Sequence, residues 1–151
     1  GAADDPVAQA LAQGYAQAVR DAEGEDRIHQ VPCGTAQRDG YETMRRLMGK
    51  GILPHGVIAC SQAAAMGAMR ALLERGRSLP QDMLFAGFGG EEVPQSKGYP
   101  ALTTLRLPWE EIGRRAVELF LWAREHPEEG PQTWKVPPVL VPRESSHSPM
   151  R

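Results

Sequence analysis

The stretch SLPQDMLFAGFGGEEVPQSKGYPALTTL, residues 78–105, decides the fold of this 151-residue chain. Its apolar run Met83–Gly87 lies between turn residues, which is the pattern of a short strand buried in a parallel sheet. The glycine-rich segment Gly87–Gly90 then leaves the carboxyl end of that strand, where open α/β sheets bind their ligands. The stretch therefore predicts a buried strand that is followed by a ligand-facing loop.

Helix and strand signals alternate through the rest of the chain. Apolar residues recur at helical spacing in four segments, two of which have a proline near the start and one of which ends at a glycine. This pattern predicts helices at about 6–22 and 38–50, between Ser61 and Gly76, and at about 109–124. Further short strands are predicted at 27–31 and 56–59. Strands that are separated by helices of this length imply right-handed βαβ units. We therefore expect an α/β fold, a three-layer αβα parallel sheet that helices cover on both faces.

Composition and charge exclude several classes of protein. Lys and Arg number 17 against 19 Asp and Glu, so the net charge of −2 lacks the basic excess of a nucleic-acid-binding surface. The two cysteines, Cys33 and Cys60, match neither metal-ligand spacing nor a disulfide scaffold, which favours a cytoplasmic setting. No apolar run approaches the ~20 residues of a membrane span. The sequence thus predicts no metal site and no membrane attachment.

Candidate catalytic groups fall into no known arrangement. Glu91 and Glu92 are neighbours in a polar loop, where solvated charges are more common than an acid/base pair. The four histidines are scattered without metalloprotease spacing, and Gly87–Gly90 lacks the glycine pattern of a dinucleotide site. We expect neither catalysis nor a cofactor.

Three more segments add to this picture through their order along the chain. They are IACSQAAAMGAMRALLERG at 58–76, PALTT at 100–104 and VPRESS at 141–146. With residues 78–105 they resemble the regulatory domain of the LacI/GalR family of bacterial transcription regulators, with its N-D-x-x-A-x-G-x-x-x-A-L-x-E-x-G, G-F-D-D, L-T-T and L-V-x-R-x-S string. The resemblance covers almost the whole chain, and the Gly-Phe-Gly-Gly form is similar to gluconate-repressor-like members. It implies a lobe of the periplasmic binding protein type I-like fold.

The resemblance also implies a division of the chain within a two-lobed receptor. Residues 1–102 correspond to the C-terminal lobe, 103–128 to a crossover strand and helix of the N-terminal lobe, 129–143 to a return strand, and 144–151 to a tail. The implied function is effector sensing and dimerisation, with operator DNA bound only through an N-terminal segment outside this chain. The alternative is a periplasmic sugar-binding protein of an ABC transporter, which uses the same two-lobed fold.

Positions that match ligand contacts in the family lie in the loops after the strands and on the first helix: Leu11, Thr35, Ser61, Gln62, Gly89 and Gly90. Leu11 and Gly89 stand where sugar-binding members often carry an arginine and an aspartate, so they supply no charge-assisted bonds to hydroxyls. The implied effector is a sugar, a sugar acid or a sugar phosphate, and the Gly89–Gly90 amides with Ser61 and Gln62 favour an anionic one. In the structural alternative, Ser61 caps a helix and the glycines form a turn with positive φ.

Small residues on the helix that ends at Gly76 let another helix approach closely. Packing against the sheet is the plainer interpretation, and a homodimer seam on the outer face is the sharper one. The resemblance favours including the seam, because these regulators dimerise partly through the corresponding helix. The residues expected in it are Met66, Met69, Arg70 and Leu73. The apolar stripe of the helix at 109–124 is expected to pack against another chain.

Overall fold

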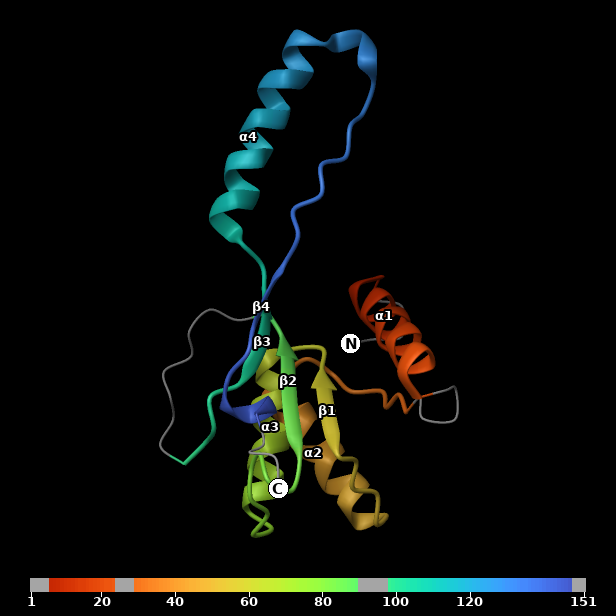
Figure 1. Cartoon of the computed structure of the whole chain (residues 1–151), viewed down its shortest axis with the longest axis vertical. Coiled ribbons are helices and arrows are strands. Elements are labelled where there is room, and N and C mark those ends of the chain that lie inside the picture. The colour runs from red at the N-terminus through yellow and green to blue at the C-terminus, as the bar shows by residue number, and fades with distance from the viewer. Residues whose placement is uncertain (1–5, 24–28, 90–97, 148–151) are drawn as a thin grey trace.

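A computed structural model describes residues 6–23, 29–89 and 98–147 of the chain. Helices and strands follow one another along these residues, with α1 followed directly by α2 and β2 directly by β3 (Figure 1). The elements are α1 (Pro6–Glu23), α2 (Gln37–Gly49), β1 (Gly56–Ala59), α3 (Gln62–Leu73), β2 (Leu84–Phe88), β3 (Thr103–Arg106), α4 (Trp109–Glu125), η2 (Pro127–Glu129), β4 (Val139–Val141) and η3 (Glu144–Ser146).

The described strands form one four-stranded sheet in the order β1-β2-β3-β4. β2 pairs in parallel with β1 and with β3, so that Ala86 lies opposite both Ile58 and Thr103. β4 runs antiparallel to β3 because the chain turns back after α4 (Figure 1). The predicted α/β class with a mostly parallel sheet is confirmed. The predicted strand at 27–31 is not, because residues 29–31 form no strand and 27–28 lie outside the described residues.

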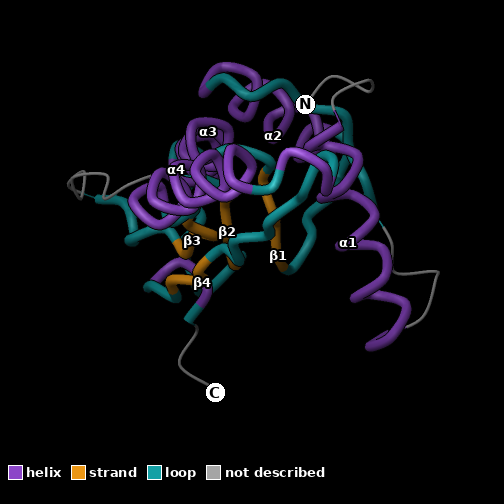
Figure 2. The backbone as a smooth tube through the Cα atoms, turned by 90° about the horizontal axis from the view of Figure 1, so that it is seen from above, coloured by secondary structure: helices purple, strands orange, loops and turns teal. Residues whose placement is uncertain are grey.

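Helices α2 and α3 lie together on one face of the sheet, as Figure 2 shows from above. Within the described residues no helix covers the opposite face, where Ile58 of β1 is 69% exposed. α1 lies beside the sheet rather than on it in both views (Figures 1 and 2). The second helical layer that the sequence predicts is therefore not seen in this part of the chain.

The core lies between α3 and the sheet. Phe85 of β2 and Leu72 of α3 are fully buried there, beside Met44 of α2. Burial of each such side chain contributes roughly 1.5–3 kcal/mol to stability. Met69, predicted on the outer dimer seam, is 0% exposed and belongs to this core. That prediction was wrong, because position 69 lies one helical turn from Ala65 and Leu72 and shares their inward face.

The crossing of α2 and α3 is unusually close. A methyl group built on Gly40 would overlap the backbone carbonyl of Ala64, and one on Gly67 would overlap the carbonyl of Gln37. Both glycines are buried inside helices. The predicted close approach of a second helix to the small residues of α3 is thus confirmed, and the second helix is α2.

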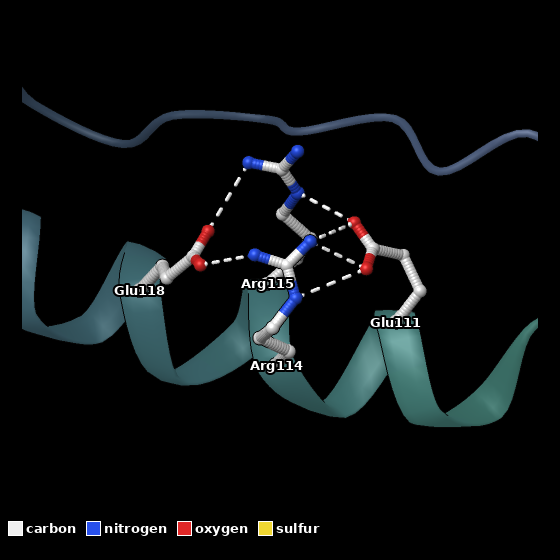
Figure 3. A network of polar contacts seen from close by, with 4 residues as sticks. All are labelled: Glu111, Arg114, Arg115 and Glu118. Carbon is white, nitrogen blue, oxygen red and sulfur yellow. Dashed lines mark hydrogen bonds and ion pairs between the residues drawn. The ribbon is translucent and has the colours of Figure 1, made fainter.

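Helix α4 extends away from the sheet and starts after Pro108, as predicted (Figure 1). None of its residues is buried, and Phe120 is 68% exposed. An ion-pair network along one side joins Glu111 and Glu118 to two arginines, Arg114 and Arg115 (Figure 3). Hydrogen bonds from Arg114 and then Arg115 lower the pKa of Glu111. Pairs of this kind within one helix support it without tertiary packing.

Candidate functional site

The carboxyl ends of β1 and β2 form the edge where a ligand was expected. Here the Ser61 hydroxyl donates a hydrogen bond of 2.6 Å to the carbonyl of Thr35, in the loop before α2. The Ser61 oxygen also accepts a bond of 3.0 Å from the amide of Ala64, so Ser61 is the N-cap of α3. Ser61 therefore caps α3 and also holds the loop of Thr35 against the start of that helix.

These two bonds restrict what Ser61 can offer to a ligand. A hydroxyl has one hydrogen to donate and two lone pairs to accept with. The hydrogen is used by Thr35 and one lone pair by Ala64, which leaves one acceptor position. In this arrangement Ser61 can accept a hydrogen bond from a ligand hydroxyl but cannot donate one to an anion.

Gly89 follows β2 and has a φ of +77°, a conformation that glycine adopts without strain. Its amide donates a hydrogen bond of 3.0 Å to the carbonyl of Leu105 on β3. The prediction that this glycine forms a turn with positive φ is confirmed. Its amide hydrogen is bonded to Leu105 and is not available to an anion. Gly90 lies outside the described residues.

Gln62 is half-buried in the first turn of α3, against the end of β2. A Cβ atom on Gly87 would lie 3.6 Å from the Cα of Gln62, so the start of α3 and this strand end are in contact. The structure thus brings Thr35, Ser61 and Gln62 to one edge. Leu11 is half-buried on α1.

Two hydrogen bonds join α1 to residues 29–30. The Tyr15 hydroxyl accepts a bond of 3.3 Å from the amide of His29, and Gln30 donates one of 3.1 Å to the carbonyl of Ala12. These contacts hold α1 against the chain that leaves it. The sequence did not predict them, because they depend on how residues far apart in sequence meet.

Two open hollows lie away from this edge. One, of about 590 Å³, lies between α4 and the returning chain and is lined by residues that include Arg115 and Trp134. The other, of about 400 Å³, is lined by residues that include Tyr99 and His147. Neither is lined by the predicted ligand residues. Within the described ranges no group of three His, Cys, Asp or Glu side chains could hold a metal ion, and no helix there could cross a membrane.

The outer side of α3 carries the other three predicted seam residues. Arg70 is exposed, and Met66 and Leu73 are half-buried. Arg70 donates a bond of 2.8 Å to Glu74, which also accepts one of 2.6 Å from the hydroxyl of Tyr41. The bond from Tyr41 and then that from Arg70 lower the pKa of Glu74. These contacts link the outer faces of α2 and α3.

A second polar cluster, which the sequence did not reveal, lies where β3 meets the chain after β4. Ser145 is buried, accepts a bond of 2.8 Å from the Thr103 amide and donates one of 2.6 Å to the carbonyl of Phe85. Arg143 donates bonds to the carbonyl of Leu102 at 2.7 Å and to the hydroxyl of Thr104 at 2.9 Å. The only sequence signal was a group of hydroxyl and arginine side chains at two strand ends.

Comparison with known proteins identifies relatives by sequence. The transcriptional repressor PurR of Haemophilus influenzae (strain PittEE) is 36% identical over 114 residues, which cover 73% of this chain and 33% of that repressor. The ribose operon repressor of Haemophilus influenzae is 31% identical over 143 residues, covering 94% of this chain and 43% of that protein. The chain therefore spans less than half the length of these relatives.

A solved structure shows the same fold at the level of coordinates. The LacI family transcriptional regulator from Enterococcus faecium, crystallised with bound ribose, superposes with a TM-score of 0.75 at 26% identity. The match covers 91% of this chain and 51% of that one. A model of the periplasmic binding protein-like domain also matches residues 1–146. The chain belongs to the periplasmic binding protein-like domain family.

Proposed function

We propose that this chain is the effector-sensing and dimerisation part of a LacI-type transcriptional regulator. The observation that carries the proposal is the edge at which Ser61 ties the loop of Thr35 to the start of α3. In this proposal residues 1–102 form one lobe, and the chain at 103–143 crosses to a second lobe and returns. Operator DNA is contacted by a part of the regulator that precedes these residues.

The hydrogen bonds at the edge favour a neutral, hydroxyl-rich effector over an anionic one. Ser61 retains only an acceptor position, and the amide of Gly89 is bonded to Leu105. Gln62 can donate and accept through its side-chain amide. A sugar hydroxyl suits both groups, whereas a phosphate or carboxylate would find neither the Ser61 hydroxyl hydrogen nor the Gly89 amide available, among the residues that the structure describes. These bonds support a neutral effector in this proposal, in place of the anionic one that the sequence suggested.

Thermal-shift screening followed by calorimetry tests this assignment. The panel contains ribose, glucose, gluconate and ribose 5-phosphate, and any ligand that prefers the native state raises its stability by mass action. Because the edge is open in this chain, we expect millimolar affinity for the neutral sugars, corresponding to about −4 kcal/mol. Gluconate also tests the gluconate-repressor-like specificity that the sequence suggests.

Two variants make the screen specific to the edge. Gln62→Ala should abolish the shift, while Gln132→Ala, an exposed amide beyond α4, should leave it unchanged. A shift that survives Gln62→Ala would place the effector elsewhere. A shift with the anionic sugars alone would show that our account of the donors at this edge is wrong.

Dimerisation is proposed through the outer side of α3, with Met66, Arg70 and Leu73 in the seam. Sedimentation at tens of micromolar should show a dimer that Met66→Glu weakens, because the variant places an unpaired charge in an apolar contact. Phe120→Glu on α4 is the comparison, since it adds the same charge to an apolar side chain that is exposed, whereas Met66 is half-buried. If Phe120→Glu alone gave monomers, the seam would lie on α4.

A further inference from the structure

We infer that the hollow of about 400 Å³ beside Tyr99 and His147 is a further small-molecule site, which takes an organic cation with an apolar stem. Residues 79–81 and 98–100 line it together with Glu144 and His147. The charged head of the ligand is an ammonium or a guanidinium group. This inference goes beyond the proposed function and does not rest on it.

The hollow lies at the opposite end of the sheet from the candidate ligand edge. Residues 79–81 precede β2 and residues 98–100 precede β3, so both segments stand at the amino ends of these parallel strands. Residues 144–147 follow β4, which is antiparallel to β3 and therefore ends on the same side. Ser61 and Gly89 follow the carboxyl ends of β1 and β2. A ligand in the hollow would thus occupy a site separate from that edge.

The floor of the hollow is formed by its half-buried apolar side chains. Leu79 and Tyr99 pack against the hydrophobic core, and Pro80 and Pro100 lie beside them in the lining. A ring or an alkyl chain placed on this floor would remove apolar surface from water on both partners, which favours binding. A volume of about 400 Å³ also falls within the ~300–1,000 Å³ of small-molecule pockets.

Hydrogen bonds hold two walls of the hollow in place. The amide of Ser78 donates a bond of 2.7 Å to the carboxylate of Asp82, whose own amide donates one of 2.8 Å to the carbonyl of Ser78. These two bonds close the turn that carries residues 79–81. In the facing segment, the amide of His147 donates a bond of 3.1 Å to the carbonyl of Glu144. Because these walls are already ordered, less binding free energy is lost in ordering them.

The carboxylate of Glu144 supplies the charge at the mouth of the hollow. One of its oxygens accepts a bond of 3.0 Å from the amide of Ala101, which fixes the position of the group although its side chain is exposed. A carboxylate can accept about four hydrogen bonds, so most of this capacity remains. Among the residues that the structure describes, no lysine or arginine lines the hollow and none of the ion pairs includes Glu144.

The carboxylate and the floor together decide the class of ligand. A cationic head at Glu144 gains charge-assisted hydrogen bonds, which are stronger than those between neutral groups. An anion would meet the negative charge of Glu144 without a lysine or arginine to offset it. Gln81 and His147 on the exposed rim can bond further hydroxyl or amino groups of the same ligand.

Three compounds of nearly the same shape test this assignment on the complete chain. They are 2-phenylethylamine, 2-phenylethanol and 3-phenylpropanoate, which carry a positive, a neutral and a negative head on one apolar stem. Titrations followed by amide NMR spectra should give a dissociation constant on the order of 1 mM for the amine, since the ligand is small and the hollow is open. The alcohol should bind about tenfold more weakly, and the anion more weakly still.

The amides that shift show where the amine binds. Those of Gln81, Tyr99 and Ala101 should move during the titration, while those of Ser61 and Gly89 should stay in place. Raising the salt concentration to about 1 M, where the Debye length is ~3 Å, should weaken binding of the amine and leave the alcohol unaffected.

Two variants of the hollow and one control complete the test. Glu144→Gln keeps an oxygen for the amide of Ala101 but removes the charge, so it should weaken binding of the amine about tenfold and leave the alcohol unchanged. Glu128→Gln, an exposed glutamate beyond α4, should change neither. Gln81→Trp places a large ring at the rim and should block both compounds.

The inference is overturned by any of three results. The first is equal affinity for the three compounds, and the second is binding of the amine that Glu144→Gln leaves unchanged. The third is a set of shifts confined to Ser61 and Gly89, which would place the amine at the candidate ligand edge. No sugar is present in these titrations, so failure of the proposed function would leave their outcome interpretable.

Discussion

Replacement of Gly67 by alanine tests the close crossing of α2 and α3, which places the loop of Thr35 beside Ser61. The added methyl group would overlap the backbone carbonyl of Gln37 and lie 2.8 Å from the amide nitrogen of Tyr41. Both groups belong to the backbone of α2, so neither can rotate away as a flexible side chain would. The two helices have to separate, and the loops at their ends move with them.

The expected magnitude is the difference between two opposing effects. In a helix interior, alanine is more favourable than glycine by about 1 kcal/mol. Forcing a methyl group into a packed contact costs about 1–3 kcal/mol, and the upper end applies because the contact is with backbone. The net loss at Gly67 is therefore about 2 kcal/mol, which lowers the melting temperature of a chain of this size by about 4–8 °C.

Circular dichroism melts of the parent chain and two variants check this value. Gly14→Ala, in the middle of α1 with nothing within 4 Å of the new methyl group, is the matched control. It should melt at or slightly above the parent temperature, because only the helix preference changes. If Gly67→Ala melted as high as Gly14→Ala, the close approach of α2 and α3 would be refuted.

Three other predictions concern the stability of the chain. Ser61→Ala should lower the free energy of unfolding by about 1 kcal/mol, measured from urea midpoints, because α3 loses its N-cap. The hydrogen bond from Tyr41 lowers the pKa of Glu74 in the folded state. The contribution of Glu74 to the free energy of unfolding is therefore present above its unfolded pKa of about 4.3 and is lost as the pH falls through the folded pKa. The urea midpoint of Glu74→Gln should therefore fall less on acidification than that of the parent; an equal fall would contradict this cause. Phe85→Ala should cost about 3–5 kcal/mol because the ring is buried, while Phe120→Ala, exposed on α4, should change stability by no more than about 0.5 kcal/mol.

Local sequence determined the elements of this protein because helix and strand signals arise from neighbouring residues. The spacing of apolar residues, Pro6 and Pro108 placed α1 and α4 within one residue of their observed ends. The short apolar run before Gly87 gave β2 to within one residue. Serine before a helical run also predicted the cap at Ser61, since the capping bond reaches only three residues along the chain.

Tertiary structure decided which side of each element is used and which polar groups stay available. Met69 looks like a surface residue in sequence, but the rotation of α3 on the sheet buries it. The amide of Gly89 looks free until β3 places the carbonyl of Leu105 against it.

The polar cluster around Ser145 depends in the same way on contacts between distant residues. Ser145 lies 60 residues after Phe85, its bonding partner, so no local pattern contains the pair. Local periodicity sets the elements through neighbouring side chains, whereas hydrogen bonds across the sheet exist only once the chain has folded. For this reason the sequence alone determined most of the helices and strands, and only the tertiary structure decided which polar groups at the carboxyl ends of β1 and β2 remain available.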